Sequence, residues 1–156
     1  MRTPNITDET KPRAGLTLRV PEMARILIVC ENDSDSGRLK TAFRKAALTS
    51  ENAHSITTGC ESAKSGRFQV VFSAPLRGDG SWRRLIDVAN YHSLSFEIVL
   101  FARKFDLNQW LEALQVGAFD VLDVLCDLPK AAESAQRAFG AAYLKRFRPR
   151  PESASP

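Results

Sequence analysis

The sequence predicts an α/β fold in which a parallel five-stranded sheet carries helices on both faces. Between residues 25 and 144, short apolar runs alternate five times with stretches of helical spacing. The first run, Ile26 to Val29, contains only branched apolar residues, as expected for a strand buried on both faces of a parallel sheet. It stops in a polar, acidic cluster that begins at Glu31, where open α/β sheets place their ligand sites.

The first half of the domain contains three of the predicted strands. After the strand at 26–29, apolar residues recur at helical spacing within 39–46 and predict a first helix. The β-branched stretch 54–58 predicts the second strand, and a brief helix is expected at 61–64. The third strand is predicted at 69–72.

The second half repeats the alternation of helix and strand. An apolar stripe within 82–89 predicts a third helix, and 97–101 is a further buried strand. The stripe 107–114 predicts a fourth helix, capped by an aspartate before it and a glycine after it. The fifth strand is expected at 121–125, and alanines at helical spacing within 131–142 predict the last helix.

Length and composition indicate a single domain. The chain has 156 residues, 44% of them hydrophobic, which is enough for one core. Residues 1–22 hold three prolines and no sustained period, and residues 146–156 are basic and rich in proline and serine. Both ends are therefore predicted to be disordered, and the folded domain is expected at 23–145.

The net charge of +4 comes from the two ends of the chain. Residues 1–22 carry +1 and residues 144–156 carry +3, so the body between them sums to zero. Because the chain between these ends has no net positive charge, it offers only weak electrostatic attraction to phosphate groups. Nucleic acid is therefore not expected as a partner. No run approaches the ~18 consecutive apolar residues of a membrane span, and no signal-peptide pattern is present. The protein is expected to be cytoplasmic and not bound to membranes.

Four features carry a resemblance to a known family. They are the opening strand with its acids, the stretch Thr58 to Ala63, the third strand followed by a Pro/Gly loop, and above all Ala-Leu-Gln-Val-Gly-Ala-Phe-Asp-Val-Leu at 113–122. In this order and spacing the chain resembles the receiver (CheY-like) domains of two-component response regulators over residues 23–144. The resemblance implies a flavodoxin-like (βα)5 doubly wound sheet with strand order 2-1-3-4-5.

The resemblance also implies an aspartyl phosphorylation site, but this chain departs from it at four of the five key positions. A serine matches the phosphoacceptor aspartate, and only one of the paired acids that hold magnesium remains. A phenylalanine matches the hydroxyl residue that ends the fourth strand, and a valine matches the lysine of the fifth. The positions are, in chain order, Cys30, Glu31, Ser73, Phe101 and Val124.

These replacements remove the chemistry of phosphoryl transfer. The Ser73 hydroxyl has too high a pKa to act as an aspartate does, and Val124 has no ammonium group to pair with an acyl phosphate. Glu31 alone is a weak candidate for a metal ligand, so neither magnesium nor another cofactor is expected. The sequence therefore predicts a degenerate pseudo-receiver that is not an enzyme and acts through protein contacts.

Two alternatives stay open. The first is a phosphorylatable response regulator with a displaced acceptor, for which Asp79 and Asp33 are the candidates. The second is a small α/β ligand-binding protein or enzyme. A reactive thiol at Cys30 is disfavoured because the neighbouring acids oppose its ionisation.

The resemblance implies protein partners, such as a histidine kinase or an output protein. The usual contact surface of the family is the face of the fourth helix, fifth strand and fifth helix, through which a homodimer can also form. Five candidate contact residues lie there: Arg103, Lys104, Phe105, Trp110 and Arg137. Because Trp110 lies on an apolar stripe, packing in the core is the preferred interpretation for that residue.

Overall fold

Five parallel strands form one sheet in the order β2-β1-β3-β4-β5 in the computed structural model, which describes residues 25–75, 80–104 and 106–145. The predicted strand order and α/β class are confirmed. The strands are β1 (Ile26–Val29), β2 (Ser50–Ala53), β3 (Val70–Ser73), β4 (Glu97–Ala102) and β5 (Asp120–Asp123). Val29 is in register with Ala53 on one side and with Ser73 on the other, so the carboxyl ends of these strands lie side by side.

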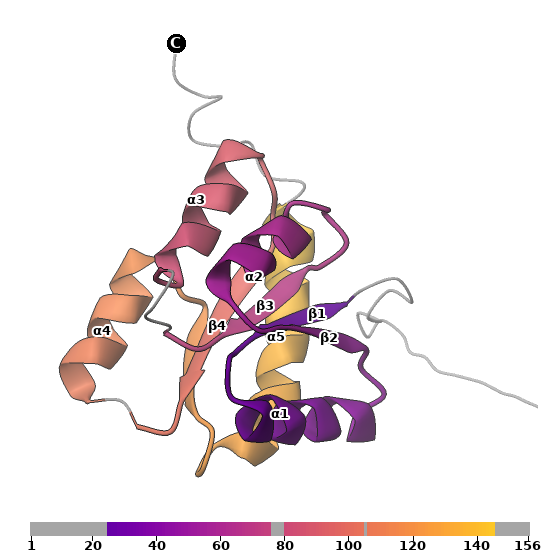
Figure 1. Ribbon diagram of the computed structural model, residues 1–156, viewed down its shortest axis with the longest axis vertical. Coiled ribbons are helices and arrows are strands. Elements are labelled where there is room, and N and C mark those ends of the chain that lie inside the picture. Colours follow the sequence, from indigo (N-terminus) through magenta and orange to yellow (C-terminus); the bar gives the residue numbers. More distant parts are fainter. Residues whose placement is uncertain (1–24, 76–79, 105, 146–156) are drawn as a thin grey trace, which may run out of the picture.

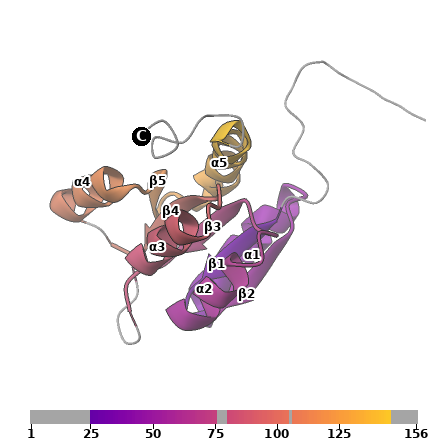
Figure 2. The same cartoon turned by 90° about the horizontal axis from the view of Figure 1, so that it is seen from above.

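Helices cover both faces of the sheet, as Figures 1 and 2 show. One face carries α1 (Asp33–Lys45) and α5 (Ala131–Lys145), and a short 3₁₀ helix, η2 (Leu128–Lys130), leads into α5. The other face carries α2 (Ile56–Ala63), α3 (Arg83–Tyr91) and α4 (Leu107–Val116).

Two apolar cores follow from the alternation of side chains along the strands. Ile26 and Ile28 of β1 pack into the core under α1 and α5, whereas Leu27 and Val29 pack into the core under α2 and α3. The same alternation in β3 and β4 divides their residues between the two cores. Every residue of β1 is therefore buried, as its unbroken apolar run predicts.

The predicted second strand at 54–58 is wrong. Ser55 is instead the N-cap of α2, and its hydroxyl oxygen accepts a hydrogen bond from the backbone N–H of Thr58 at 3.1 Å. The actual strand, β2, comes four residues earlier and reads Ser-Glu-Asn-Ala. Strand β2 lies at the edge of the sheet and is only partly buried, so its sequence contains no apolar run that would predict a strand.

The caps predicted for α4 are confirmed. The Asp106 carboxylate accepts from the N–H of Gln109 at 2.8 Å, the Gln109 side chain accepts from the N–H of Asp106 at 3.1 Å, and Gly117 ends the helix at a φ of 134°. No helix within the described ranges has the length and apolar character to span a membrane. The segments predicted to be disordered, 1–22 and 146–156, lie outside the described residues, as do Asp79 and Phe105.

Candidate functional site

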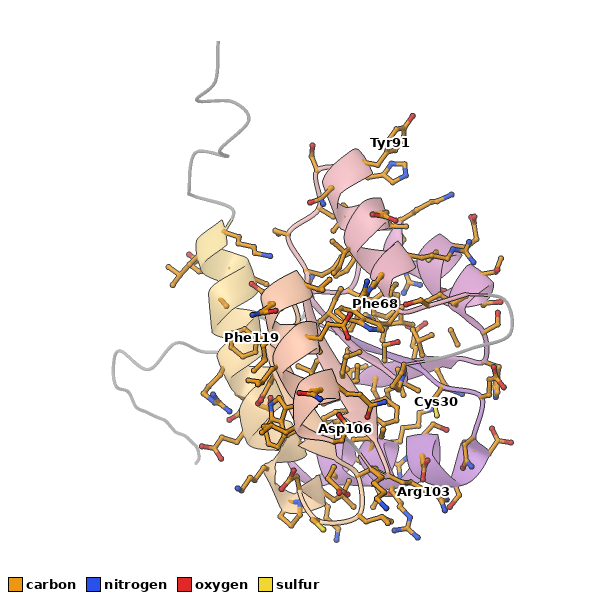
Figure 3. All side chains as sticks on the ribbon, turned by 90° about the vertical axis from the view of Figure 1, so that its left-hand side faces the viewer. Cys30, Phe68, Tyr91, Arg103, Asp106 and Phe119 are labelled. Carbon is orange, nitrogen blue, oxygen red and sulfur yellow. The ribbon has the colours of Figure 1, made fainter. Side chains whose placement is uncertain are left out.

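The carboxyl edge of the sheet is the place where the sequence predicts a site. Strand β3 lies between β1 and β4, so the residues that follow β1 and β4 flank the end of β3. Cys30 follows β1, Ser73 ends β3 and Arg103 follows β4. Figure 3 shows Cys30 and Arg103 at this edge, beside α1.

Ser73, at the position implied for a phosphoacceptor, is fully buried. Its hydroxyl donates a hydrogen bond to the carbonyl oxygen of Ala74 at 2.7 Å. A neutral hydroxyl engaged with the backbone lacks the negative charge that attacks a phosphoryl group. Activation would need a general base, and no side chain among the described residues is hydrogen-bonded to the Ser73 hydroxyl.

Cys30, Phe101 and Val124 occur together in the apolar core under α1 and α5. At most 2% of each residue is exposed. Three of the five positions implied for the phosphorylation site therefore contribute apolar packing between the sheet and these helices. The resemblance implies polar and charged groups at most of these positions.

The thiol of Cys30 is held in its protonated form. Burial raises the pKa of this thiol, a hydrogen bond with the Asn32 backbone opposes the increase, and the negative charges of Asp35, Glu31 and Asp33 add to it. The Sγ atom donates to the carbonyl oxygen of Asn32 at 3.4 Å. Cys30 is therefore a poor nucleophile and a poor metal ligand at neutral pH.

The acids after β1 are dispersed among different partners. Asp33 is exposed and lies 3.1 Å from Nε2 of His54, while Asp35 pairs with Arg103. Glu31 is exposed and makes no ion pair with another described residue. Magnesium prefers several carboxylate or water oxygens in an octahedral set. Within the described ranges no three His, Cys, Asp or Glu side chains are grouped to hold a metal ion, and Asp33 and Asp35 are engaged by His54 and Arg103.

An ion pair between Arg103 and Asp35 crosses the carboxyl edge. The Arg103 Nε donates to both carboxylate oxygens of Asp35, at 3.2 and 3.3 Å, and Nη2 lies 3.2 Å from Oδ1. The Asp35 side chain is 11% exposed and the Arg103 side chain 52% exposed. Because β3 lies between β1 and β4, this pair passes over the end of β3, where Ser73 lies. The sequence analysis did not identify this pair, since 68 positions separate its members.

The acids at the end of β5 are used to close the turn that follows. The Asp123 carboxylate accepts the backbone N–H groups of Leu125 at 2.8 Å and Cys126 at 3.2 Å. Asp127 in turn accepts the N–H of Asp123 at 3.0 Å. These carboxylates stabilise a local turn, which is a structural role.

The predicted contact residues divide into two groups. Arg103 pairs with Asp35, and Arg137 lies 3.3 Å from Asp120, so both arginines have intramolecular partners. Lys104 is exposed and forms no ion pair with another described residue. The preferred interpretation of Trp110 as a core residue is wrong, because 42% of this residue is exposed. Helical spacing identified the apolar stripe of α4 but gave no information on whether another element covers it.

Comparisons with known proteins agree with the fold. No protein-family model matches the sequence, and no curated protein matches it. Solved structures do match: the signal receiver domain of an HD domain-containing protein from Pseudomonas fluorescens is 18% identical, with a TM-score of 0.67, and the match covers 78% of this chain and 98% of that one. The chemotaxis protein CheY4 of Vibrio cholerae is 18% identical, with a TM-score of 0.64 and coverage of 74% and 98%.

A two-component response regulator from Clostridium difficile is also similar, at 18% identity and a TM-score of 0.62, over 80% of this chain and 99% of that one. At these identities the likeness concerns the fold. The chain has the fold of response regulator receiver (CheY-like) domains.

Proposed function

We propose that this chain contains a signalling domain of the two-component type that acts through protein contacts and does not use phosphoryl transfer. It is a pseudo-receiver, without enzymatic activity and without a need for magnesium. Its partners on this proposal are proteins such as a histidine kinase or an output protein, or a second copy of the chain bound through the α4, β5 and α5 face.

The observation that carries this proposal is the composition of the carboxyl edge. Cys30, Phe101 and Val124 pack together in the core, and the Ser73 hydroxyl is buried against a backbone carbonyl. Arg103 and Asp35, which lie on either side of this point, form an ion pair with each other. Phosphoryl transfer depends on positioned charge around the transferring group, and the described residues do not supply it.

Restoring single residues would not rebuild such a site. A receiver that is phosphorylated needs a carboxylate, a metal site and a cation together, and their effects depend on one another. The proposal therefore does not rest on Ser73 alone. It rests on the replacement of charged groups by packed apolar ones at several positions at once.

Labelling with a small acyl phosphate in the presence of magnesium tests the proposal. The full chain is incubated with the reagent, and its intact mass is measured immediately, with an active receiver domain treated in parallel as the positive control. We expect the mass of this chain to stay unchanged while the control gains one phosphoryl group. An adduct that is lost on treatment with hydroxylamine would contradict the proposal.

The same experiment separates the alternative with a displaced acceptor. Asp33 is exposed and lies beside His54, so it is accessible to a reagent in solution. If an adduct forms, its loss in Asp33→Asn or in Asp79→Asn identifies the acceptor. Small molecules that remain with the purified protein under native mass spectrometry would instead favour the ligand-binding alternative.

A further inference from the structure

The outer face of α1 carries a cluster of basic residues. They are Arg38, Lys40, Arg44 and Lys45, which we call the α1 cations. Lys40 is half-buried and the other three are exposed. Figure 1 shows α1 at the periphery of the domain. None of the α1 cations forms an ion pair with another described residue.

Most other basic residues in the described ranges are ion-paired. Each of the following lies within 3.3 Å of a carboxylate oxygen: Arg25, Lys64, Arg67, Arg83, Arg103, Arg137 and Lys145. The body of the chain is therefore neutral in sum, but its uncompensated positive charge is concentrated on α1. The summed charge predicts no nucleic-acid partner, whereas this distribution favours an anionic partner at α1.

The helix dipole explains only part of this cluster. Arg44 and Lys45 lie in the last turn of α1, where the free carbonyl groups stabilise cations. Arg38 and Lys40 lie before that turn, and the effect of the dipole falls off within one turn. These two cations therefore gain nothing from the helix itself, and an external anion would stabilise all four.

The α1 cations form two rows along the outer face. On a helix of 3.6 residues per turn, Lys40 and Arg44 lie along one flank of this face. Arg38 and Lys45 lie along the other flank. Each flank therefore presents two positive charges, and the rows diverge to either side of the outermost line of the helix.

The strip between the two rows is made of small residues. Gly37 and Thr41 lie there, and both are exposed. A Cβ added at Gly37 would meet no atom within 4 Å beyond its own helix and chain neighbours, so the strip is uncovered at that point. The rows can therefore approach opposite walls of a groove while the strip faces the floor of that groove.

Negative charge is confined to the other end of α1. Asp33 and Asp35 lie in its first turn, and the exposed Glu31 precedes the helix. Asp35 is ion-paired with Arg103. The contact with an anionic partner is therefore limited to Gly37–Lys45, which spans about 12 Å of helix.

The outer face of α1 lacks the apolar residues that a protein or a membrane partner would need. The exposed large apolar residues of the described ranges lie outside α1, while Leu39 and Phe43 of this helix are buried. Protein interfaces have apolar or aromatic centres and are depleted in lysine, and a helix that lies on a membrane inserts an apolar face. Nucleic-acid phosphates are bound by lysine and arginine without such anchors, so they fit this face best.

We infer that α1 binds double-stranded DNA, with the helix in the major groove and its two rows of cations against the phosphates of opposite strands. A helix with its side chains is about 10–12 Å across, and the major groove is about 12 Å wide. Gly37 and Thr41 lack the long side chains that distinguish base pairs, so the binding is independent of base sequence. This inference goes beyond the proposed function, and either can fail without the other.

Fluorescence anisotropy of a labelled duplex of arbitrary sequence tests the inference. The full chain is titrated into the duplex at several salt concentrations between about 50 and 200 mM, and we expect a dissociation constant on the order of 1–100 μM. Residues 146–156 are also basic, so the affinity of the wild type alone does not isolate α1. Substitutions on α1 in the full chain do so.

The variant Lys40→Gln with Arg44→Gln removes one row and keeps residues of good helix propensity. We expect it to weaken binding about tenfold or more and to lower the slope of log affinity against log salt by about two. The variant Lys64→Gln with Lys104→Gln is the matched control, because it makes the same change of charge outside α1. It should keep the salt slope of the wild type.

The second row tests the placement in the groove. Because both strands are contacted, Arg38→Gln with Lys45→Gln should lower the affinity and the salt slope as much as the substitution of the first row does. An effect of only one row would overturn the placement of α1 between two strands.

Two other polyanions test the choice of DNA. Vesicles of phosphatidylserine and phosphatidylcholine, and polyglutamate, should bind more weakly than the duplex. Binding to either of them that is as tight as to the duplex and is lost in Lys40→Gln with Arg44→Gln would overturn the choice of DNA. A wild type that does not bind the duplex at about 50 mM salt, or an α1 variant with the affinity and salt slope of the wild type, would overturn the inference as a whole.

Discussion

Arg103 and Asp35 form an ion pair that ties the chain leaving β4 to the first turn of α1. Three donor–acceptor distances of 3.2, 3.2 and 3.3 Å describe it, and the Asp35 carboxylate also lies at the positive end of the α1 dipole. The pair crosses the end of β3, so the segment before α4 is held from the far side of that strand. A side-chain ion pair therefore links the two sides of the carboxyl edge.

Loss of this ion pair should lower stability measurably. Arg103→Ala leaves a largely buried carboxylate without its counterion, and we expect a decrease of about 1–2 kcal/mol in the free energy of unfolding. Adding Asp35→Asn should recover part of that loss, because the uncompensated charge is removed. Urea denaturation of the two single variants and the double variant measures the coupling.

Arg83→Ala is the control for this cycle. Its partner Glu112 is well exposed, so the loss should stay below about 0.5 kcal/mol. Equal losses in Arg103→Ala and Arg83→Ala would show that the Arg103–Asp35 pair is an ordinary surface contact.

Introducing the missing acceptor should destabilise the fold. Ser73→Asp buries a carboxylate with no cation beside it, and we expect a loss of about 3 kcal/mol at pH 7. Burial raises the pKa of such a carboxyl above its unfolded value. The difference from wild type should therefore be smallest below the unfolded pKa and should grow as the pH rises through the folded pKa.

Thermal denaturation at pH 4 and pH 7 checks this dependence, with Ser73→Ala as the control. That variant loses one hydrogen bond to Ala74 and should cost about 1 kcal/mol at both pH values. An Asp variant as stable as the Ala variant at pH 7 would mean that a cation or water reaches this position.

Replacing Phe101 by a smaller hydroxyl residue should open a cavity in the core under α1 and α5. Phe101 is 1% exposed and packs in the same cluster as Phe43 and Phe72. We expect Phe101→Thr to lower the free energy of unfolding by about 3 kcal/mol and Phe101→Leu by about 1 kcal/mol. A Thr variant of wild-type stability would indicate that the ring is not part of the packed core.

The thiols should differ widely in reactivity. Cys126 is exposed, whereas Cys30 is buried and its pKa is raised by burial and by the nearby acids. Alkylation followed by peptide mapping should modify Cys126 first at pH 7.5, and Cys30 should need a higher pH than an ordinary thiol. Faster modification of Cys30 than of Cys126 would contradict this description of the carboxyl edge.

The raised pKa of the Cys30 thiol also makes the stability of the fold depend on pH. The unfolded thiol ionises at a lower pH than the folded one, so Cys30 stabilises the fold fully below the unfolded pKa. This contribution is lost as the pH rises through the folded pKa. Cys30→Ala should therefore show a weaker decline in stability at alkaline pH than the wild type does.

The sequence predicted most of the fold because the buried elements carry strong periodic signals. The apolar run of β1 and the capping residues of α4 are local features, and the structure confirms both. Strand β2 could not be predicted in the same way. It lies at an edge, its residues are mainly polar, and its burial depends on packing with β1 and α1.

The sequence predicted which residues of a phosphorylation site are replaced, but it did not predict the contacts that the replacing and neighbouring residues make. The sequence shows that Ser73, Phe101 and Val124 replace the residues of a phosphorylation site, and their burial follows from their position in or next to buried strands. The Arg103–Asp35 pair depends on the order of the strands, which brings together residues that are far apart in the chain. The exposure of Trp110 likewise depends on which elements lie beside α4.

The central claim is that the carboxyl edge of this sheet does not accept a phosphoryl group. Amide NMR of the full chain during titration with magnesium and beryllofluoride, which mimics an acyl phosphate, tests it most directly, because binding is detected even where an adduct is labile. The account predicts that the amide signals of Asp35, Ser73 and Arg103 stay in place. Saturable shifts centred on these three residues would contradict it.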